Sequence, residues 1–381
     1  MSLVSSCGVA LRHVGGGKLR IAQVAPLCES VPPQCYGGTE RIVSYLTEEL
    51  VWQGHDVTLF ASGDSETSAR LIALTPRAQR SAGCVDPLPE HLVMIEEVYR
   101  RDHEFDVIHF HIDYLHFPIS RREQRLHVTT LHGRLDLPDL VGLYRAFPDM
   151  PVITISDAQA AALPSITAQG TVYHGLPEQL YELEESPGDY LAFIGRISPE
   201  KRLDRAIEIA ARSGLPLRVA AKLDRKDERY YHDVIAPLLP HRDVELVGEI
   251  CDRDKQDFLG RARALVFPID WPEPFGLVMI EAMACGTPVV AFRCGSVPEV
   301  IEHGVTGFIC DTVDEMVTAV GRVSELSRAT CRQRFEQRFT ARRMTDDYVH
   351  LYHQLIARGH DAREQAEPAG LHHPGHELAR R

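Results

Sequence analysis

Short aliphatic or β-branched runs alternate with longer amphipathic stretches along most of the 381-residue chain. Strands buried inside a parallel sheet are apolar on both faces, because the connecting helices cover both sides. The alternation therefore predicts an α/β fold with doubly wound parallel sheets. The expected strands begin near Arg20, Asp56, Asp106, His127, Pro151 and Thr171 in the first half, and near Tyr190, Leu217, Val244, Ala264 and Pro288 in the second.

Residues 176–189 (LPEQLYELEESPGD) interrupt this alternation with prolines and acidic residues, as is typical of a linker. We therefore expect two Rossmann-like domains that face each other across a cleft, the usual ligand site of such folds. Residues 19–180 would form the first domain and 186–340 the second. Helical sequence follows over 341–358, while residues 1–18 and 359–381 would be a flexible extension and a disordered tail.

Charge and composition exclude several classes of protein. The formal charge of −13 argues against a general nucleic-acid-binding protein or a polybasic membrane-surface protein. The sequence contains no apolar run of about 18 residues, as a membrane-spanning helix requires. Arg12 and His13 make the N-terminus a poor signal peptide. Nine cysteines without a CxxC pair indicate reduced, mostly buried thiols, so we expect a cytoplasmic protein without a disulfide framework.

The sequence GGTE at residues 37–40 opens the first expected helix. Backbone amides at a helix N-terminus attract anions, so Gly37 and Gly38 are candidates for contact with an anionic ligand. A flexible loop that leads into a helix is the alternative interpretation. The pattern is not a dinucleotide fingerprint, which should follow the first strand directly, and the sequence contains no P-loop motif.

A second candidate site is GRISPEKR at residues 195–202, directly after the first strand of the second half. Arg196 stands at the strand end and Lys201 at the start of a helix, so both could bind one diphosphate through charge-assisted hydrogen bonds. A solvated helix start is the alternative. Lysine occurs only five times in the chain, which favours a function for Lys201.

The most specific pattern is EPFGLVMIEAMACGTPVV at residues 273–290. Pro274 suits the first position of a helix and Gly286 its end. Glu273 and Glu281 would then lie on the order of 10 Å apart along the helix, at two ends of one elongated ligand. The helix is otherwise apolar, and a buried carboxylate needs a partner. We therefore expect a hydrogen-bonding partner for Glu281, such as a ligand hydroxyl.

Three histidines raise the question of a metal site. His109 and His111 face the same side of one strand, and His132 follows the next strand. No HExxH or CxxC spacing accompanies them. Histidines with structural hydrogen bonds and histidines that bind sugar hydroxyls are the two alternatives to a metal site.

Taken in order, GGTE, His132–Gly133, GRISPEK, EPFGLVMIEAMACGTPVVA and GSVPEVIEHGVTGF resemble the retaining glycosyltransferases of family 4, which have the GT-B fold. The resemblance extends from about residue 20 to residue 358. It implies a nucleotide-sugar donor bound mainly by the second domain. It also implies that the last helix, 341–358, returns to the first domain.

The resemblance also assigns roles in donor binding. Arg196 and Lys201 would hold the diphosphate, Glu281 the ribose hydroxyls and Glu273 the hydroxyls of the transferred sugar. Lys222 would face the nucleotide at a position where relatives often have a glycine-rich turn. Further donor contacts are expected from Gly37, Gly38, Phe275, Gly276 and Leu277.

For catalysis, the resemblance implies a metal-independent reaction that retains the anomeric configuration. His132 would contact the 6-hydroxyl of the sugar, and Glu273, Arg196 and Lys201 would complete the catalytic set. Fixed positive charge would stabilise the departing diphosphate without a protein nucleophile. No cofactor or metal is expected.

The resulting hypothesis is a hexosyltransferase that uses UDP-glucose or a similar donor. A nucleotide-sugar epimerase of related fold and a non-catalytic sugar-nucleotide-binding protein are the alternatives. The sequence does not identify the acceptor, for which a small molecule or a glycan is expected. Acceptor-side candidates are Tyr36, His111, Asp113 and Asp136.

Overall fold

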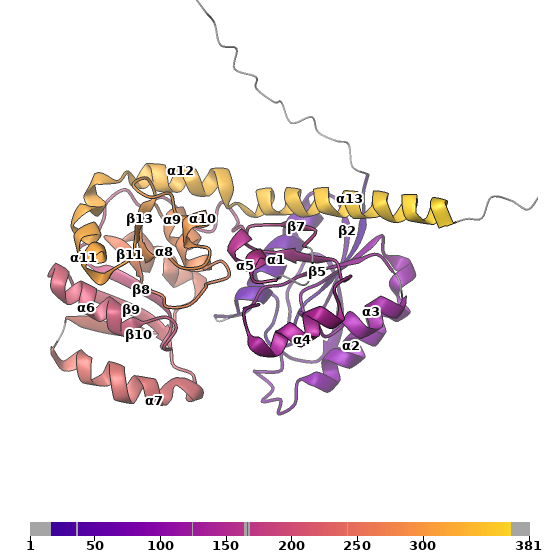
Figure 1. Ribbon diagram of the computed structural model, residues 1–381, viewed down its shortest axis with the longest axis horizontal. Coiled ribbons are helices and arrows are strands. Elements are labelled where there is room, and N and C mark those ends of the chain that lie inside the picture. The colour runs from indigo at the N-terminus through magenta and orange to yellow at the C-terminus, as the bar shows by residue number, and fades with distance from the viewer. Residues whose placement is uncertain are drawn as a thin grey trace, which may run out of the picture.

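The computed structural model describes residues 17–35, 37–123, 125–163, 166, 168–241 and 243–366. These residues form two domains that lie side by side, each built around a parallel sheet (Figure 1). The predicted α/β architecture with two Rossmann-like domains is confirmed. The expected extension lies outside the described residues up to residue 16, as does the tail beyond residue 366.

The first domain contains a seven-stranded sheet in the order β3-β2-β1-β4-β5-β6-β7, with all neighbouring strands parallel. The sequence analysis missed β3, whose side chains are only partly buried. The strands are β1 (Arg20–Val24), β2 (Asp56–Ser62), β3 (Arg70–Thr75), β4 (Val107–Phe110), β5 (His127–Thr130), β6 (Val152–Thr154) and β7 (Gly170–Thr171).

The second domain contains a six-stranded parallel sheet in the order β10-β9-β8-β11-β12-β13. Strand β13 was also missed, because its four residues follow a run of turn-forming residues. The strands are β8 (Leu191–Arg196), β9 (Leu217–Lys222), β10 (Val244–Gly248), β11 (Ala264–Phe267), β12 (Val289–Phe292) and β13 (Gly307–Cys310).

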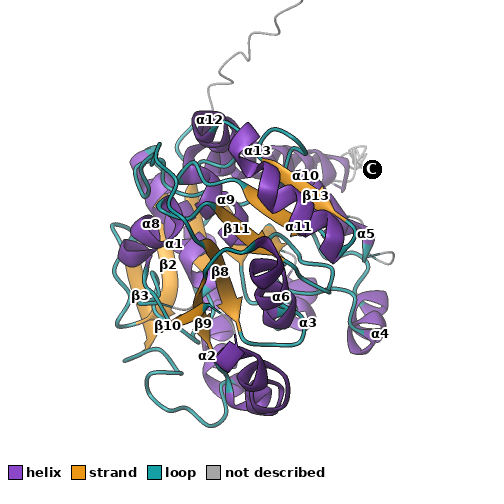
Figure 2. Cartoon of the chain, turned by 90° about the vertical axis from the view of Figure 1, so that its left-hand side faces the viewer, coloured by secondary structure: helices purple, strands orange, loops and turns teal. Residues whose placement is uncertain are grey.

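Helices connect the strands and cover the sheets, as Figure 2 shows for the second domain. The first domain has α1 (Gly38–Trp52), α2 (Leu88–Arg100), α3 (Phe117–Glu123), α4 (Pro138–Ala146) and α5 (Asp157–Ala161), with a 3-10 turn at Asp102–Glu104. The second has α6 (Leu203–Ser213), α7 (Glu228–Tyr230), α8 (Asp252–Gly260), α9 (Leu277–Ala284), α10 (Val297–Val300), α11 (Val313–Arg322) and α12 (Arg328–Arg338), with short 3-10 or π turns at Arg225–Asp227, Tyr231–Ile235, Ala236–His241 and Val323–Glu325.

The last helix, α13 (Ala341–Ala366), packs on the first domain, as the resemblance implied (Figure 1). Met344, Tyr348, Tyr352 and Leu355 lie on one face of the helix and are buried against that domain. The predicted helix end at residue 358 is wrong, because α13 continues through Gly359 for eight more residues. Alanine, arginine, glutamate and glutamine in this stretch favour the helix enough to offset the cost of one glycine.

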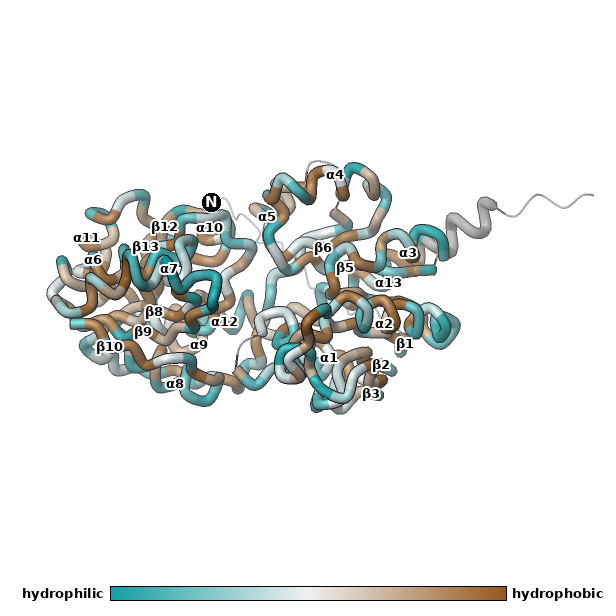
Figure 3. Tube along the Cα trace, turned by 90° about the horizontal axis from the view of Figure 1, so that it is seen from below, coloured by the Kyte–Doolittle hydropathy of each residue, from teal (hydrophilic) through white to brown (hydrophobic). Residues whose placement is uncertain are grey.

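Each domain has its own buried core, and hydrophobic segments of the trace occur in both domains (Figure 3). The strand order reverses between β1 and β4 in the first sheet and between β8 and β11 in the second. Ligands of doubly wound sheets bind beside such reversals, at the carboxyl ends of the strands. The fold therefore places the loops after β1, β4, β8 and β11 at the expected ligand site.

Candidate functional site

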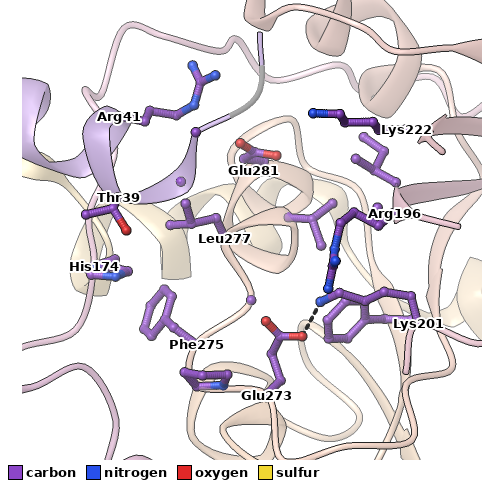
Figure 4. Close-up of a pocket in the computed structure, with 18 of the residues that line it drawn as sticks. Thr39, Arg41, His174, Arg196, Lys201, Lys222, Glu273, Phe275, Leu277 and Glu281 are labelled. Carbon is purple, nitrogen blue, oxygen red and sulfur yellow. Dashed lines mark hydrogen bonds and ion pairs between the residues drawn. The ribbon is translucent and has the colours of Figure 1, made fainter. Parts of the chain in front are cut away.

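A cavity of about 410 Å³ lies between the two domains at these strand ends (Figure 4). All ten residues predicted to bind the donor line it, together with Arg41, His174, Trp271 and Lys255, to which no role was assigned from the sequence. The predicted residues in its wall are Gly37, Gly38, His132, Arg196, Lys201, Lys222, Glu273, Phe275, Gly276, Leu277 and Glu281.

The first domain contributes the N-terminus of α1. Gly37 precedes the helix with φ 141°, and a Cβ there would lie 2.8 Å from Pro33 Cβ. Gly38 lies against Leu277 from the opposite domain. A Cβ added to Gly38 would lie 3.7 Å from Leu277 Cδ1. No side chain caps the helix N-terminus. Its amides therefore provide positive potential at the cavity, as the GGTE sequence suggested.

Two cations come from adjacent strand ends in the second domain. Arg196 ends β8 and Lys222 ends β9, and the two residues are neighbours in the sheet register. Arg196 Nη1 lies 3.7 Å from Asp224 Oδ2 and 3.8 Å from Asp227 Oδ2. Lys222 Nζ lies 3.6 Å from Asp224 Oδ1. The side chains of both cations line the cavity, so an anionic ligand would compete with these carboxylates for them.

Lys201 and Glu273 form a close ion pair in the cavity wall (Figure 4). Lys201 lies in the turn between β8 and α6, and its Nζ donates a hydrogen bond to Glu273 Oε2. The Nζ also lies 4.9 Å from the centre of the Trp271 ring, which favours a cation through its π face. The sequence analysis assigned both charged residues to the donor site but did not predict their pairing.

The loop before α9 differs from the sequence prediction. Pro274 does not begin the helix; α9 starts at Leu277, and Gly276 precedes it with φ 78°. This positive φ favours glycine, because side chains with a Cβ rarely adopt it. Ser296 stabilises the loop, since its amide donates to Glu273 O and its hydroxyl to Phe275 O. The amides at the start of α9 therefore meet the cavity.

Glu281 has a partner within the chain that sequence analysis missed. Lys255 of α8 donates a hydrogen bond from Nζ to Glu281 Oε1 at 2.7 Å. Asp252, at the first position of α8, lies 3.3 Å from the same Nζ and forms an ion pair with Arg41 of α1. The scarcity of lysine could have indicated Lys255, because Lys201, Lys222 and Lys255 line the cavity and only five lysines occur in the chain.

His132 follows β5 and lies in the cavity wall, and its ring contacts His111 on the side away from the cavity. His132 Nε2 lies 2.9 Å from His111 Nδ1, and His111 Nε2 lies 2.8 Å from Gln23 Oε1. His132 Nδ1 is buried and has no hydrogen-bond partner among the described residues. Burial lowers the pKa of His132 to about 3, so the ring is neutral near pH 7. The expected contact with a sugar hydroxyl therefore stays a prediction.

One expectation for the neighbouring histidines needs correction, and for His109 the structure favours one of the two alternatives. His111 is buried behind His132 and does not line the cavity, so its assignment to the acceptor side is wrong. His109 Nδ1 lies 2.7 Å from the hydroxyl of Tyr352, and its Nε2 lies 2.8 Å from the hydroxyl of Thr130. Because both ring nitrogens have partners within the protein, His109 is a structural histidine rather than a sugar ligand. His174, which the sequence analysis did not assign, stacks on His132 with ring centres 5.3 Å apart.

The remaining acceptor-side candidates are Asp113, Asp136 and Tyr36, of which Asp136 lines a smaller pocket that shares Glu273 and Pro274 with the cavity. Asp113 is exposed with φ 51°, and Asp136 is exposed and paired with Arg134 through two hydrogen bonds of 2.8 and 2.7 Å. Neither carboxylate lines the cavity, so an acceptor would meet them only outside it. Tyr36 lies outside the described residues.

The expectation of reduced cysteines is wrong at one pair. Cys35, in the loop before α1, forms a disulfide with Cys251, which precedes α8. The two cysteines are 216 residues apart in sequence and join the two domains beside the cavity. Six other cysteines of the described chain are free thiols, and three of these are buried.

Among the described residues, no group of three or more histidine, cysteine or acidic side chains is arranged to hold a metal ion. The histidine metal site therefore has no support in this part of the chain, and metal independence stays a prediction. The same residues contain no helix with the length and apolar character needed to cross a membrane.

Comparison with known proteins gives independent evidence. Residues 182–340 match the family Glycosyl transferases group 1, and residues 36–166 match Glycosyltransferase Family 4. The N-acetyl-alpha-D-glucosaminyl L-malate synthase of Bacillus anthracis is 25% identical over 375 residues, covering 84% of this chain and 96% of that protein. The D-inositol 3-phosphate glycosyltransferase of Saccharomonospora viridis is 30% identical over 255 residues, covering 58% of this chain and 54% of that protein.

Solved structures show the same fold. A glycosyltransferase involved in avilamycin A biosynthesis superposes with a TM-score of 0.68 at 24% identity, covering 89% of this chain and 98% of that one. HepE of Anabaena, solved with UDP and glucose, superposes with a TM-score of 0.69 at 20% identity. The match covers 88% of this chain and 100% of HepE. The two-domain fold, with its cleft, and the sequence matches indicate the same family. The chain therefore belongs to glycosyltransferase family 4, the glycosyl transferases of group 1 with the GT-B fold.

Proposed function

We propose that this protein is a retaining hexosyltransferase that takes a hexose from a nucleotide diphosphate sugar, UDP-glucose or a close relative. The observation that carries the proposal is the convergence of Arg196, Lys201 and Lys222 with the N-terminus of α9 on one cavity wall. Such fixed positive charge suits a diphosphate leaving group. A cytosolic location stays a prediction from the sequence.

The two glutamates fit the two ends of such a donor. Glu273 lies beside Lys201, where the hydroxyls of the transferred sugar would meet the diphosphate-binding cations. Glu281 lies one turn into α9 and is 3% exposed, where it would accept hydrogen bonds from the ribose. We place the nucleoside near Glu281 and the sugar near Glu273, with the diphosphate between them.

In the proposed reaction, the bond between the anomeric carbon and the diphosphate oxygen breaks, and the electron pair stays on the diphosphate. Arg196, Lys201 and the amides of α9 stabilise this developing charge, and they are in place before the reaction. The acceptor oxygen then forms its bond to the anomeric carbon on the same face. Its proton passes to an oxygen of the departing phosphate.

A donor screen tests the proposal. The protein is incubated with UDP-glucose, UDP-galactose, UDP-N-acetylglucosamine, ADP-glucose and GDP-mannose, and release of nucleoside diphosphate is measured. The screen is broad because similar proteins include an N-acetyl-alpha-D-glucosaminyl L-malate synthase and a phosphatidyl-myo-inositol mannosyltransferase. We expect one donor to be consumed, with slow transfer to water in place of an acceptor. Epimerised donor or complete absence of turnover would contradict the proposal.

Two variants show whether turnover comes from this cavity. Lys201→Ala should lower nucleoside diphosphate affinity about 10- to 100-fold, because a charge-assisted hydrogen bond contributes roughly 1.5–3 kcal/mol. Lys226→Ala is the matched control, since Lys226 is exposed and lies outside the cavity. Equal UDP affinity of the Lys201→Ala and Lys226→Ala variants in calorimetry would contradict the diphosphate assignment.

A further inference from the structure

Four side chains of alternating charge extend from the first domain to the base of the cavity. Arg41 of α1 pairs with Asp252 of α8, Lys255 lies 3.3 Å from Asp252 Oδ1, and Lys255 bonds to Glu281 at 2.7 Å. We call this set of residues the ionic relay. Arg41 is its only member from the first domain, so the relay crosses the cleft.

The relay is almost closed to solvent. The side chains of Arg41, Lys255 and Glu281 are 5%, 11% and 3% exposed, and only that of Asp252 reaches 25%. A buried charge without a partner is costly, so each member depends on its neighbours. Lys255 in particular neutralises Glu281 and holds one of its two carboxylate oxygens, which restrains the carboxylate in the cavity wall.

Lys255 has two carboxylates within reach, and the first domain decides between them. While Arg41 neutralises Asp252, the Lys255 ammonium can form its short hydrogen bond to Glu281. Without Arg41, Asp252 would be a poorly paired anion 3.3 Å from the same ammonium and would attract it away from Glu281. The orientation of Glu281 is thus linked to the contact between the two domains.

We propose that Lys255 is a positioning residue for Glu281, and that the Arg41–Asp252 pair completes the nucleoside subsite only when the two domains meet as they do here. This inference rests on the proposed function, because it assumes that Glu281 binds ribose. Linkage requires the reciprocal effect, so once the disulfide between Cys35 and Cys251 is reduced, a bound nucleotide would also favour the contact between the domains.

The first test compares UDP with 2′-deoxy-UDP by calorimetry. The unmodified protein should prefer UDP, and Lys255→Met should lose about tenfold in UDP affinity together with most of this preference. Lys255→Arg should retain the preference, because it restores the cation. Arg253→Met is the matched control on the same helix, since its side chain is 95% exposed, and it should behave as the unmodified protein.

The second test addresses the link to the first domain. Arg41→Met should weaken UDP binding severalfold, in the same direction as Lys255→Met. Adding Asp252→Asn removes the competing carboxylate, so the double variant Arg41→Met/Asp252→Asn should regain most of the affinity. Thermal unfolding midpoints identify any variant that does not fold, and this pair of variants tests the relay even if Lys255→Met does not fold.

The outcomes separate the inference from the proposed function. Loss of the ribose preference in Glu281→Gln but not in Lys255→Met would overturn the positioning role and leave the function intact. Preserved ribose preference in Glu281→Gln would contradict the ribose assignment itself. A double variant as weak as Arg41→Met would overturn the link between the domains.

Discussion

Glu273 and Glu281 each have a lysine partner in the cavity wall, yet we expect their replacement to have different effects. Glu281→Gln should weaken binding of both UDP and the UDP-sugar, because Glu281 lies where the ribose is placed. Glu273→Gln should bind UDP almost normally but lose turnover and discrimination between sugars. Calorimetry with UDP and initial rates with two donors distinguish the variants. The reverse pattern would mean that the donor lies in the opposite direction along α9.

The sequence identified the residues of the site better than it identified the side chains with which they pair. Arg196, Lys201, Glu273 and Glu281 were all identified, because their local patterns are specific and all four line the cavity. The pairing of Glu281 with Lys255 could not be predicted, since it joins residues 26 positions apart through the packing of two helices. The burial of His111 behind His132 likewise depends on neighbouring strands.

At the scale of elements, apolar runs predicted the buried strands, while short or half-exposed strands escaped. Strand β3 has intermediate burial, and β13 follows turn residues, so neither shows a long apolar run. Pro274 was taken as the start of a helix and Gly286 as its end because of their intrinsic preferences, and α9 does end shortly before Gly286. Tertiary contacts prevailed at Pro274, where the glycine at 276 and Ser296 fix a loop instead.

Five largely buried histidines lie in β4 or in the loops that follow β4, β5 and β7, and they should make the first domain sensitive to acid. Burial lowers the pKa values of His109, His111, His116, His132 and His174 below the usual 6.5. The unfolded chain therefore binds more protons than the folded one below about pH 6.5. Stability is full above that pH and falls as the pH is lowered, by up to about 1.4 kcal/mol per pH unit for each histidine.

Urea unfolding between pH 7 and pH 5 measures this effect. His116→Gln should lower the slope of unfolding free energy against pH, because it removes one such group away from the cavity. The exposed His103 offers the matched control variant His103→Gln. The same slope in His116→Gln and the unmodified protein would contradict the burial of a neutral His116.

At the scale of the whole molecule, the arrangement of two domains brings the site together. The linker and both domains were predicted from composition and alternation, and the GT-B fold from the motifs. The disulfide between Cys35 and Cys251 could not be predicted, because it depends on how the domains meet. The same is true of the pair formed by Arg41 and Asp252.

The most direct test of the central claim is time-resolved proton NMR of the sugar first released from an α-linked donor. We expect the α-anomer before mutarotation, at an undiminished rate after EDTA treatment, because Arg196, Lys201 and the amides of α9 supply the positive charge. Initial release of the β-anomer, or activity that is abolished by EDTA and restored by a divalent metal, would contradict this claim.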